Sequence, residues 1–119
     1  MRNRTFRFEN LEIWKIAIEI TDELFLIADY LESQKLFRFT DQLRGAGMSI
    51  TNNIAEGSGD GNAEFIRFLR YSRRSAFECA NILILLERNK LIKTERKIRL
   101  YNRLDELCRK ITNFSKTLK

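Results

Sequence analysis

The feature that most limits the possible folds of this chain is the absence of proline from its 119 residues. Proline ends or kinks helices, so a chain without proline favours long, uninterrupted helices. Glycine also weakens helices, and all five glycines lie between positions 45 and 61. Outside that stretch the chain therefore has no strong helix breaker.

Apolar residues recur every three or four positions in four segments that short polar links separate. This spacing is typical of amphipathic helices, and no segment alternates with the period of a strand. The predicted helices span residues 10–32, 40–56, 62–89 and 94–117. Four such helices predict an all-α fold, an antiparallel up-and-down four-helix bundle, with residues 1–119 as a single domain.

The helix ends are predicted from residues that commonly occupy such positions. Asn10, Thr40 and Thr94 are expected to be N-caps, because their side-chain oxygens can accept a backbone N–H. The third helix is expected to open at Asn62. Gly57 suits the left-handed position that often follows a helix, so we expect it to end the second helix.

Several kinds of chemistry are excluded by composition. Histidine is absent, which removes the commonest general acid–base group and the commonest zinc ligand. Cys79 and Cys108 stand alone and are predicted to be reduced core residues of a cytosolic protein. The glycine-rich loop at 57–61 lacks the Gly-Lys-Ser/Thr ending of a phosphate-binding loop and is interpreted as a helix–helix turn. We expect no enzymatic activity, no metal and no cofactor.

Membrane insertion and export are not expected either. The longest apolar runs, 24–28 and 82–86, are far shorter than the about 20 residues that a spanning helix needs. Arg2, Arg4 and Arg7 stand near the N-terminus, but no apolar signal core follows them. The sequence therefore predicts a cytoplasmic protein without a membrane partner.

The net charge of +6 is unevenly distributed along the chain. Residues 88–119 carry +8, whereas residues 1–87 carry −2. A basic segment of this kind usually has a nucleic acid as its partner.

One face of the second predicted helix carries small and polar residues where a buried face would carry Leu and Ile. We interpret this polar seam as hydrogen-bonding to a neighbouring helix, with a solvated face as the alternative. Gly45 and Gly47 cost helix stability and suggest that another backbone approaches closely. The seam consists of Gln42, Ala46, Ser49, Asn53 and Glu56.

The same region makes the chain resemble the 23S rRNA intervening-sequence proteins. The central signature is Gln42-Leu43-Arg44, Ser49-Ile50 and Asn53-Ile54-Ala55-Glu56-Gly57. Further matches are Phe8, Leu11, Trp14 and Ala17 near the start, and Glu64-Phe65, Phe68-Leu69, Ser75 and Glu78 in the third helix. Gly45-Ala46-Gly47 departs from the bulkier or basic residues usual there.

The resemblance implies a four-helix bundle that assembles as a homo-pentamer. A related accessory protein of diversity-generating retroelements, the variability determinant, is a basic pentamer that binds nucleic acid and a reverse transcriptase. The rRNA-insert family itself has no settled biochemical activity. Its motif or interface residues correspond here to Gln42, Arg44, Ser49, Asn53, Glu56 and Gly57.

Four arginines of the third helix form the candidate nucleic-acid site. Arg67, Arg70, Arg73 and Arg74 fall within roughly 120° of arc opposite the apolar stripe, and Tyr71 beside them could stack on a base. Arginine suits phosphate because its planar guanidinium donates two hydrogen bonds at once. The alternative is a solvated face, or arginines paired with carboxylates.

Two hypotheses follow. In the first, a homo-oligomeric ring presents these arginines to RNA or DNA, with help from Lys97 and Arg103 on the fourth helix. In the second, the ring is a scaffold for a protein partner and its basic surface is incidental.

Overall fold

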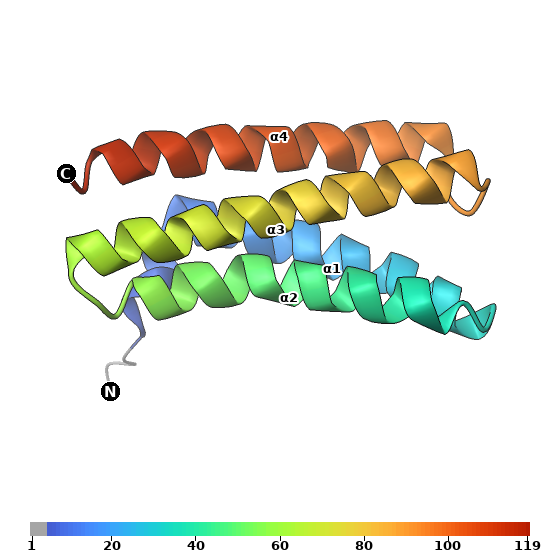
Figure 1. Cartoon of the computed structure of the whole chain (residues 1–119), viewed down its shortest axis with the longest axis horizontal. Coiled ribbons are helices and arrows are strands. Elements are labelled where there is room, and N and C mark those ends of the chain that lie inside the picture. Colours follow the sequence, from blue (N-terminus) through green and yellow to red (C-terminus); the bar gives the residue numbers. More distant parts are fainter. Residues whose placement is uncertain (1–4) are drawn as a thin grey trace.

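The computed structural model describes residues 5–119, which form a short 3₁₀ turn and four long helices. Arg2 and Arg4 lie outside the described residues. The all-α antiparallel four-helix bundle is confirmed, since successive helices run in opposite directions (Figure 1). The elements are the turn η1 Arg7–Asn10 and the helices α1 Glu12–Ser33, α2 Phe37–Gly57, α3 Asn62–Arg88 and α4 Thr94–Lys116.

The four helices share one apolar core. α3 lies between α2 and α4, and α1 packs against α2 and α4 from behind in the view of Figure 1. The helices α2 and α3 pack most extensively, and the contacts of α4 are fewer. The described residues include no helix long and apolar enough to cross a membrane.

The predicted N-caps of the first two helices are wrong. Asn10 is the last residue of the 3₁₀ turn, and Leu11 is the N-cap of α1. Thr40 lies inside α2, which begins three residues earlier. Its hydroxyl donates to the carbonyl of Leu36 at 3.1 Å, the bond to residue i−4 that threonine makes within a helix. The first link is therefore shorter than the sequence predicts.

The other two starts are closer to the prediction. α3 opens at Asn62 as expected. Thr94 is the first residue of α4, but the N-cap is Lys93. In the described part of the chain, no side-chain hydrogen bond caps the N-terminus of any of the four helices. The cap preferences of Asn and Thr therefore do not set these ends.

Lysine, and not glycine, takes the left-handed position after two helices. Lys35 follows α1 with φ 62° and Lys90 follows α3 with φ 59°. The N–H of Leu36 donates to the carbonyl of Leu31 at 2.9 Å, and the corresponding bond after α3 is 2.8 Å. These are the bonds of a Schellman motif, so both helices end through backbone geometry.

Gly57 is not in the left-handed position, and this prediction is wrong. It is the last residue of α2, and no glycine of the described chain has a positive φ. A Cβ at Gly57 would lie 2.7 Å from Cβ of Phe68 and 2.9 Å from Cδ1 of Phe65. Glycine is needed here because the end of α2 lies directly against α3.

The close approach expected at the other two helical glycines is not observed. A Cβ at Gly45 would meet no neighbouring atom of residues 5–119 within 4 Å. A Cβ at Gly47 would make ordinary contacts of 3.5 Å with Leu24 and Thr21. At Gly47 the Thr21 hydroxyl of α1 donates to the backbone carbonyl at 3.3 Å, but the tightest approach to a glycine of α2 is at its C-terminal end.

Candidate nucleic-acid interface

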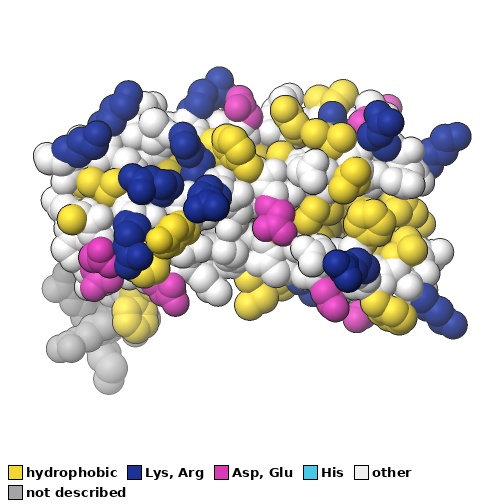
Figure 2. Space-filling model, in the orientation of Figure 1, with side chains coloured by type: hydrophobic (Ala, Val, Ile, Leu, Met, Phe, Trp, Pro, Cys, Tyr) yellow, Lys and Arg dark blue, Asp and Glu magenta, His cyan; other side chains and the backbone are white. Residues whose placement is uncertain are grey.

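On the face of the bundle that Figure 2 shows, basic side chains gather at one end. In Figure 2, Lys and Arg gather on the left, over the N-terminal half of α3 and the C-terminal half of α4. Hydrophobic side chains cover more of the right half, over the other halves of the same two helices. The antiparallel arrangement produces this contrast, because it places the end of α4 beside the start of α3.

Arg67 forms an ion pair and a hydrogen bond with neighbours on its own helix. Its guanidinium pairs with the Glu64 carboxylate at 2.6 Å and donates to the Tyr71 hydroxyl at 3.2 Å. These hydrogen bonds, that to Glu64 first, raise the pKa of Arg67 above its usual value. Tyr71 is half-buried and its ring lies edge-on to Phe68. The structure thus ties the predicted stacking residue into a local cluster.

The other three arginines have no carboxylate partner within residues 5–119. Arg70 and Arg74 are exposed. Arg73 Nη1 donates to Thr112 Oγ1 of α4 at 3.2 Å, and its guanidinium lies over the Phe77 ring, 5.8 Å from the centroid. Within residues 5–119, the guanidinium N–H groups of Arg70 and Arg74 make no hydrogen bond, and Arg73 uses one of its own for Thr112. The remaining N–H groups can donate to a partner.

Lys97 and Arg103 lie apart from these arginines. Lys97 Nζ lies 3.7 Å from the Glu87 carboxylate, and Arg103 pairs with Glu19 at 2.9 Å. The pair to Glu19 belongs to a row of ion pairs that joins α4 to α1. Its other members are Arg99 with Glu23 and Lys110 with Glu12. Much of the basic charge of α4 is therefore balanced inside the chain.

Two lysines that the sequence analysis did not assign complete the basic end. Arg70 and Arg73 line a groove between α3 and α4 together with Lys116 and Lys119. Thr112 and Ser115 add hydroxyls, and the floor consists of Ile66, Leu69 and Ile111. No Asp or Glu of the described chain lines this end of the groove. The antiparallel topology could have indicated the two lysines, since it places them opposite the α3 arginines.

With this geometry in place, comparison with known proteins identifies the family. The family model described as 23S rRNA-intervening sequence protein matches residues 9–113. The chain belongs to this family. No curated protein matches the chain.

A solved structure supports the same assignment. It is the crystal structure of a protein with unknown function from the S23 ribosomal protein family of Bacteroides thetaiotaomicron. The two share 25% sequence identity and superpose with a TM-score of 0.82. The match covers 87% of this chain and 98% of the Bacteroides chain.

The residues that carried the family resemblance divide into two groups. Ser49 lies between α2 and α3, since Ser75 Oγ donates to Ser49 Oγ at 2.8 Å. Asn53 Nδ2 donates to the Ser49 carbonyl at 2.8 Å and to its hydroxyl at 3.0 Å. Gln42 and Glu56 are exposed at the two ends of the seam. The middle of the polar seam therefore faces a neighbouring helix of the same chain.

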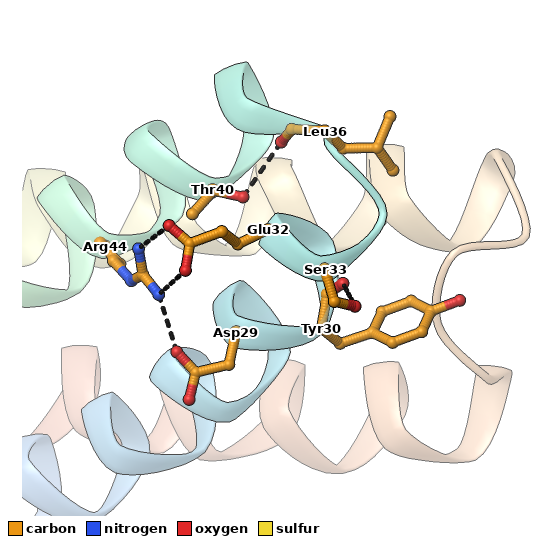
Figure 3. Close-up of polar contacts among 7 residues, drawn as sticks. All are labelled: Asp29, Tyr30, Glu32, Ser33, Leu36, Thr40 and Arg44. Carbon is orange, nitrogen blue, oxygen red and sulfur yellow. Dashed lines mark hydrogen bonds and ion pairs between the residues drawn. The ribbon is translucent and has the colours of Figure 1, made fainter.

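Arg44 of the family signature joins α2 to α1 (Figure 3). Its Nη2 lies 2.7 Å from Asp29 Oδ1, and both its terminal nitrogens reach the Glu32 carboxylate at 3.3 Å. The hydrogen bonds to Glu32 and then Asp29 raise the pKa of Arg44 above its usual value. Two carboxylates satisfy this arginine, so it is a structural residue in the isolated chain.

The two thiols show no sign of activation. Burial raises the pKa of Cys79 to about 12 and that of Cys108 to about 11. Both are free thiols. No group of three metal-ligating side chains occurs in the part of the chain that the structure describes.

Proposed function

We propose that this protein is a cytoplasmic homo-oligomer, a pentamer, that binds RNA or DNA through the arginines of α3. It is a binding protein and not an enzyme. The carrying observation is that Arg70, Arg73 and Arg74 have no carboxylate partner among residues 5–119, while most cations of α4 are paired. Unpaired guanidinium groups are the ones that a phosphate backbone can engage without displacing an existing ion pair.

Assembly would strengthen this interface. A ring repeats the basic end of each subunit and so offers several phosphate-binding sites to one long polyanion. Simultaneous contact with several sites raises the overall affinity above the modest affinity of one subunit. The Bacteroides relative belongs to a family named for a ribosomal protein, which fits an RNA partner.

The test is anisotropy of labelled RNA and DNA across a salt series. Binding to duplex DNA should weaken with salt at a log–log slope of about −0.9 for each phosphate contacted. Exchanging Arg70 and Arg74 for glutamate should weaken binding by roughly tenfold or more and reduce the slope by about 1 per lost contact.

A matched control is the double exchange of Arg88 and Lys93 for glutamate. It alters the net charge equally, and both residues are exposed near the opposite end of the bundle. Equal losses for the two double variants would mean that net charge alone drives binding, and the site would be wrong. No binding of the parent at low salt would contradict the function itself.

A scaffold for a protein partner is the second candidate. It is favoured by large apolar side chains that remain exposed on α1 and α2, namely Leu26, Phe37 and Met48. Apolar groups of this size commonly mark association surfaces. Sedimentation should give the mass of a pentamer, and a monomer at micromolar concentration would contradict the assembly.

A further inference from the structure

The groove between α3 and α4 continues beyond its basic end. Three adjoining hollows along the two helices share lining residues. The first two share Arg73 and Thr112, and the second and third share Phe77, Asp105 and Cys108. The three hollows, here together called the α3–α4 groove, follow the seam of the two helices, and the Arg73–Thr112 hydrogen bond crosses this groove where the first two hollows meet. It passes from the basic end to the end lined by Tyr101 and Ile84.

The charges along the α3–α4 groove suit a polyanion. Arg70, Arg73 and the two C-terminal lysines line its basic end without a carboxylate among the described residues. Asp105 is the one carboxylate in the lining of the three hollows, and Arg109 lies 3.4 Å from it. A phosphate at the basic end therefore meets cations and hydroxyls, and no uncompensated negative side chain.

Aromatic rings line the same groove beyond the cations. Phe77 is 63% exposed and stands one turn after Arg73, whose guanidinium lies over its ring. Tyr101 is 40% exposed, with the Lys97 ammonium 5.0 Å from its ring centroid. An exposed ring beside a phosphate-binding cation is the arrangement with which proteins stack unpaired bases.

We propose that the α3–α4 groove binds a single strand of RNA or DNA. Its basic end holds the phosphates, and the Phe77 ring stacks on a base. The preference for a single strand follows from the position of the rings. The faces of bases in a duplex are covered by the neighbouring base pairs, so Phe77 gains contact only when a base is unpaired. This inference rests on the proposed function and specifies its ligand.

The test compares a labelled oligouridylate with an RNA duplex of equal length, using the full chain. Phe77→Ala should weaken binding of the single strand by roughly tenfold and leave the affinity for duplex unchanged. Lys116→Ala with Lys119→Ala should weaken binding of both. Phe6→Ala is the matched control, since Phe6 is 73% exposed next to the turn η1 and lies outside the groove. It should change neither affinity.

A second variant separates stacking from packing. Phe77→Trp offers a larger ring and should retain or strengthen binding of the single strand, with the mass in solution unchanged. Loss of affinity in Phe77→Trp, or a fall in mass in Phe77→Ala, would make Phe77 a packing or subunit contact and overturn the inference. Equal effects of Phe77→Ala on both ligands would also overturn it, and the proposed function would still stand. If neither ligand binds the parent, both fail.

Discussion

The two sides of α3 meet their neighbouring helices in different ways. On the side of α2, Ser72 Oγ donates to the Ile50 carbonyl at 2.8 Å, and Gly57 lies against two phenylalanines of α3. On the side of α4, one side-chain hydrogen bond crosses between the helices, from Arg73 to Thr112 at 3.2 Å. The first interface is closed and largely buried, and the second is open along the α3–α4 groove.

The difference follows from side-chain size. Serine and glycine let two helix backbones approach until hydroxyls can reach carbonyl groups. Arginine and phenylalanine on the opposite side are exposed and line the α3–α4 groove. One helix can therefore fix the register of the bundle with one side and line an open groove with the other.

The largest effect on the closed side is expected from Gly57→Ala. The added Cβ would lie 2.7 Å from Cβ of Phe68, so the helices must separate or rotate. We expect a loss of about 1–3 kcal/mol in the free energy of unfolding, measured by urea denaturation at fixed protein concentration.

Gly45→Ala is the control, because it lies in the same helix and its Cβ would meet no described neighbour. It should gain about 1 kcal/mol from helix propensity. If Gly57→Ala were as stable as the parent, the two helices would not be closely fitted at this point.

A second difference between the two sides concerns the thiols. Burial raises the pKa of Cys79 to about 12, and it raises the pKa of the half-buried Cys108 in the groove to about 11. The thiolate is the reactive form. At neutral pH the half-buried Cys108 should thus react faster with iodoacetamide than the buried Cys79, and both should react far more slowly than an ordinary thiol.

The rate of thiol modification should increase with pH. A raised pKa keeps the thiol protonated, so the rate for Cys108 should rise about tenfold per pH unit until pH approaches 11. Mass spectrometry of the modified peptides measures both rates. Faster modification of Cys79 would mean that the α2 side of α3 opens more readily than the groove.

The fold was largely predictable, because apolar periodicity depends on the helix alone. All four predicted helices are present and contribute to the core, and α3 begins at its predicted residue. The errors are at ends where local preference and backbone geometry compete. Nothing in the residue type marks Lys35 and Lys90 for the left-handed conformation, whereas glycine is the usual occupant.

The candidate site was less predictable, since it depends on contacts between helices. The sequence showed that four arginines share one face of α3. It did not show that Arg67 forms an ion pair with Glu64. Nor did it show that some basic residues of α4 pair with carboxylates of α1 while others line the groove. Arg73 and Thr112 are more than 30 residues apart in the chain, and their hydrogen bond depends on how α3 and α4 are aligned along their length. The apolar periodicity of each helix does not determine this alignment.

The smallest expected effect comes from removing one hydroxyl on each side of the comparison. Ser72 is fully buried and its hydroxyl donates to a carbonyl of α2, so Ser72→Ala should cost about 1 kcal/mol of the free energy of unfolding. Ser115 lines the open groove and is half-buried, so Ser115→Ala should change stability by less than about 0.5 kcal/mol. Urea denaturation of the two variants compares the interfaces with the same chemical change. Equal losses would mean that the groove is as closely packed as the α2 side, and the contrast between a closed and an open side of α3 would be wrong.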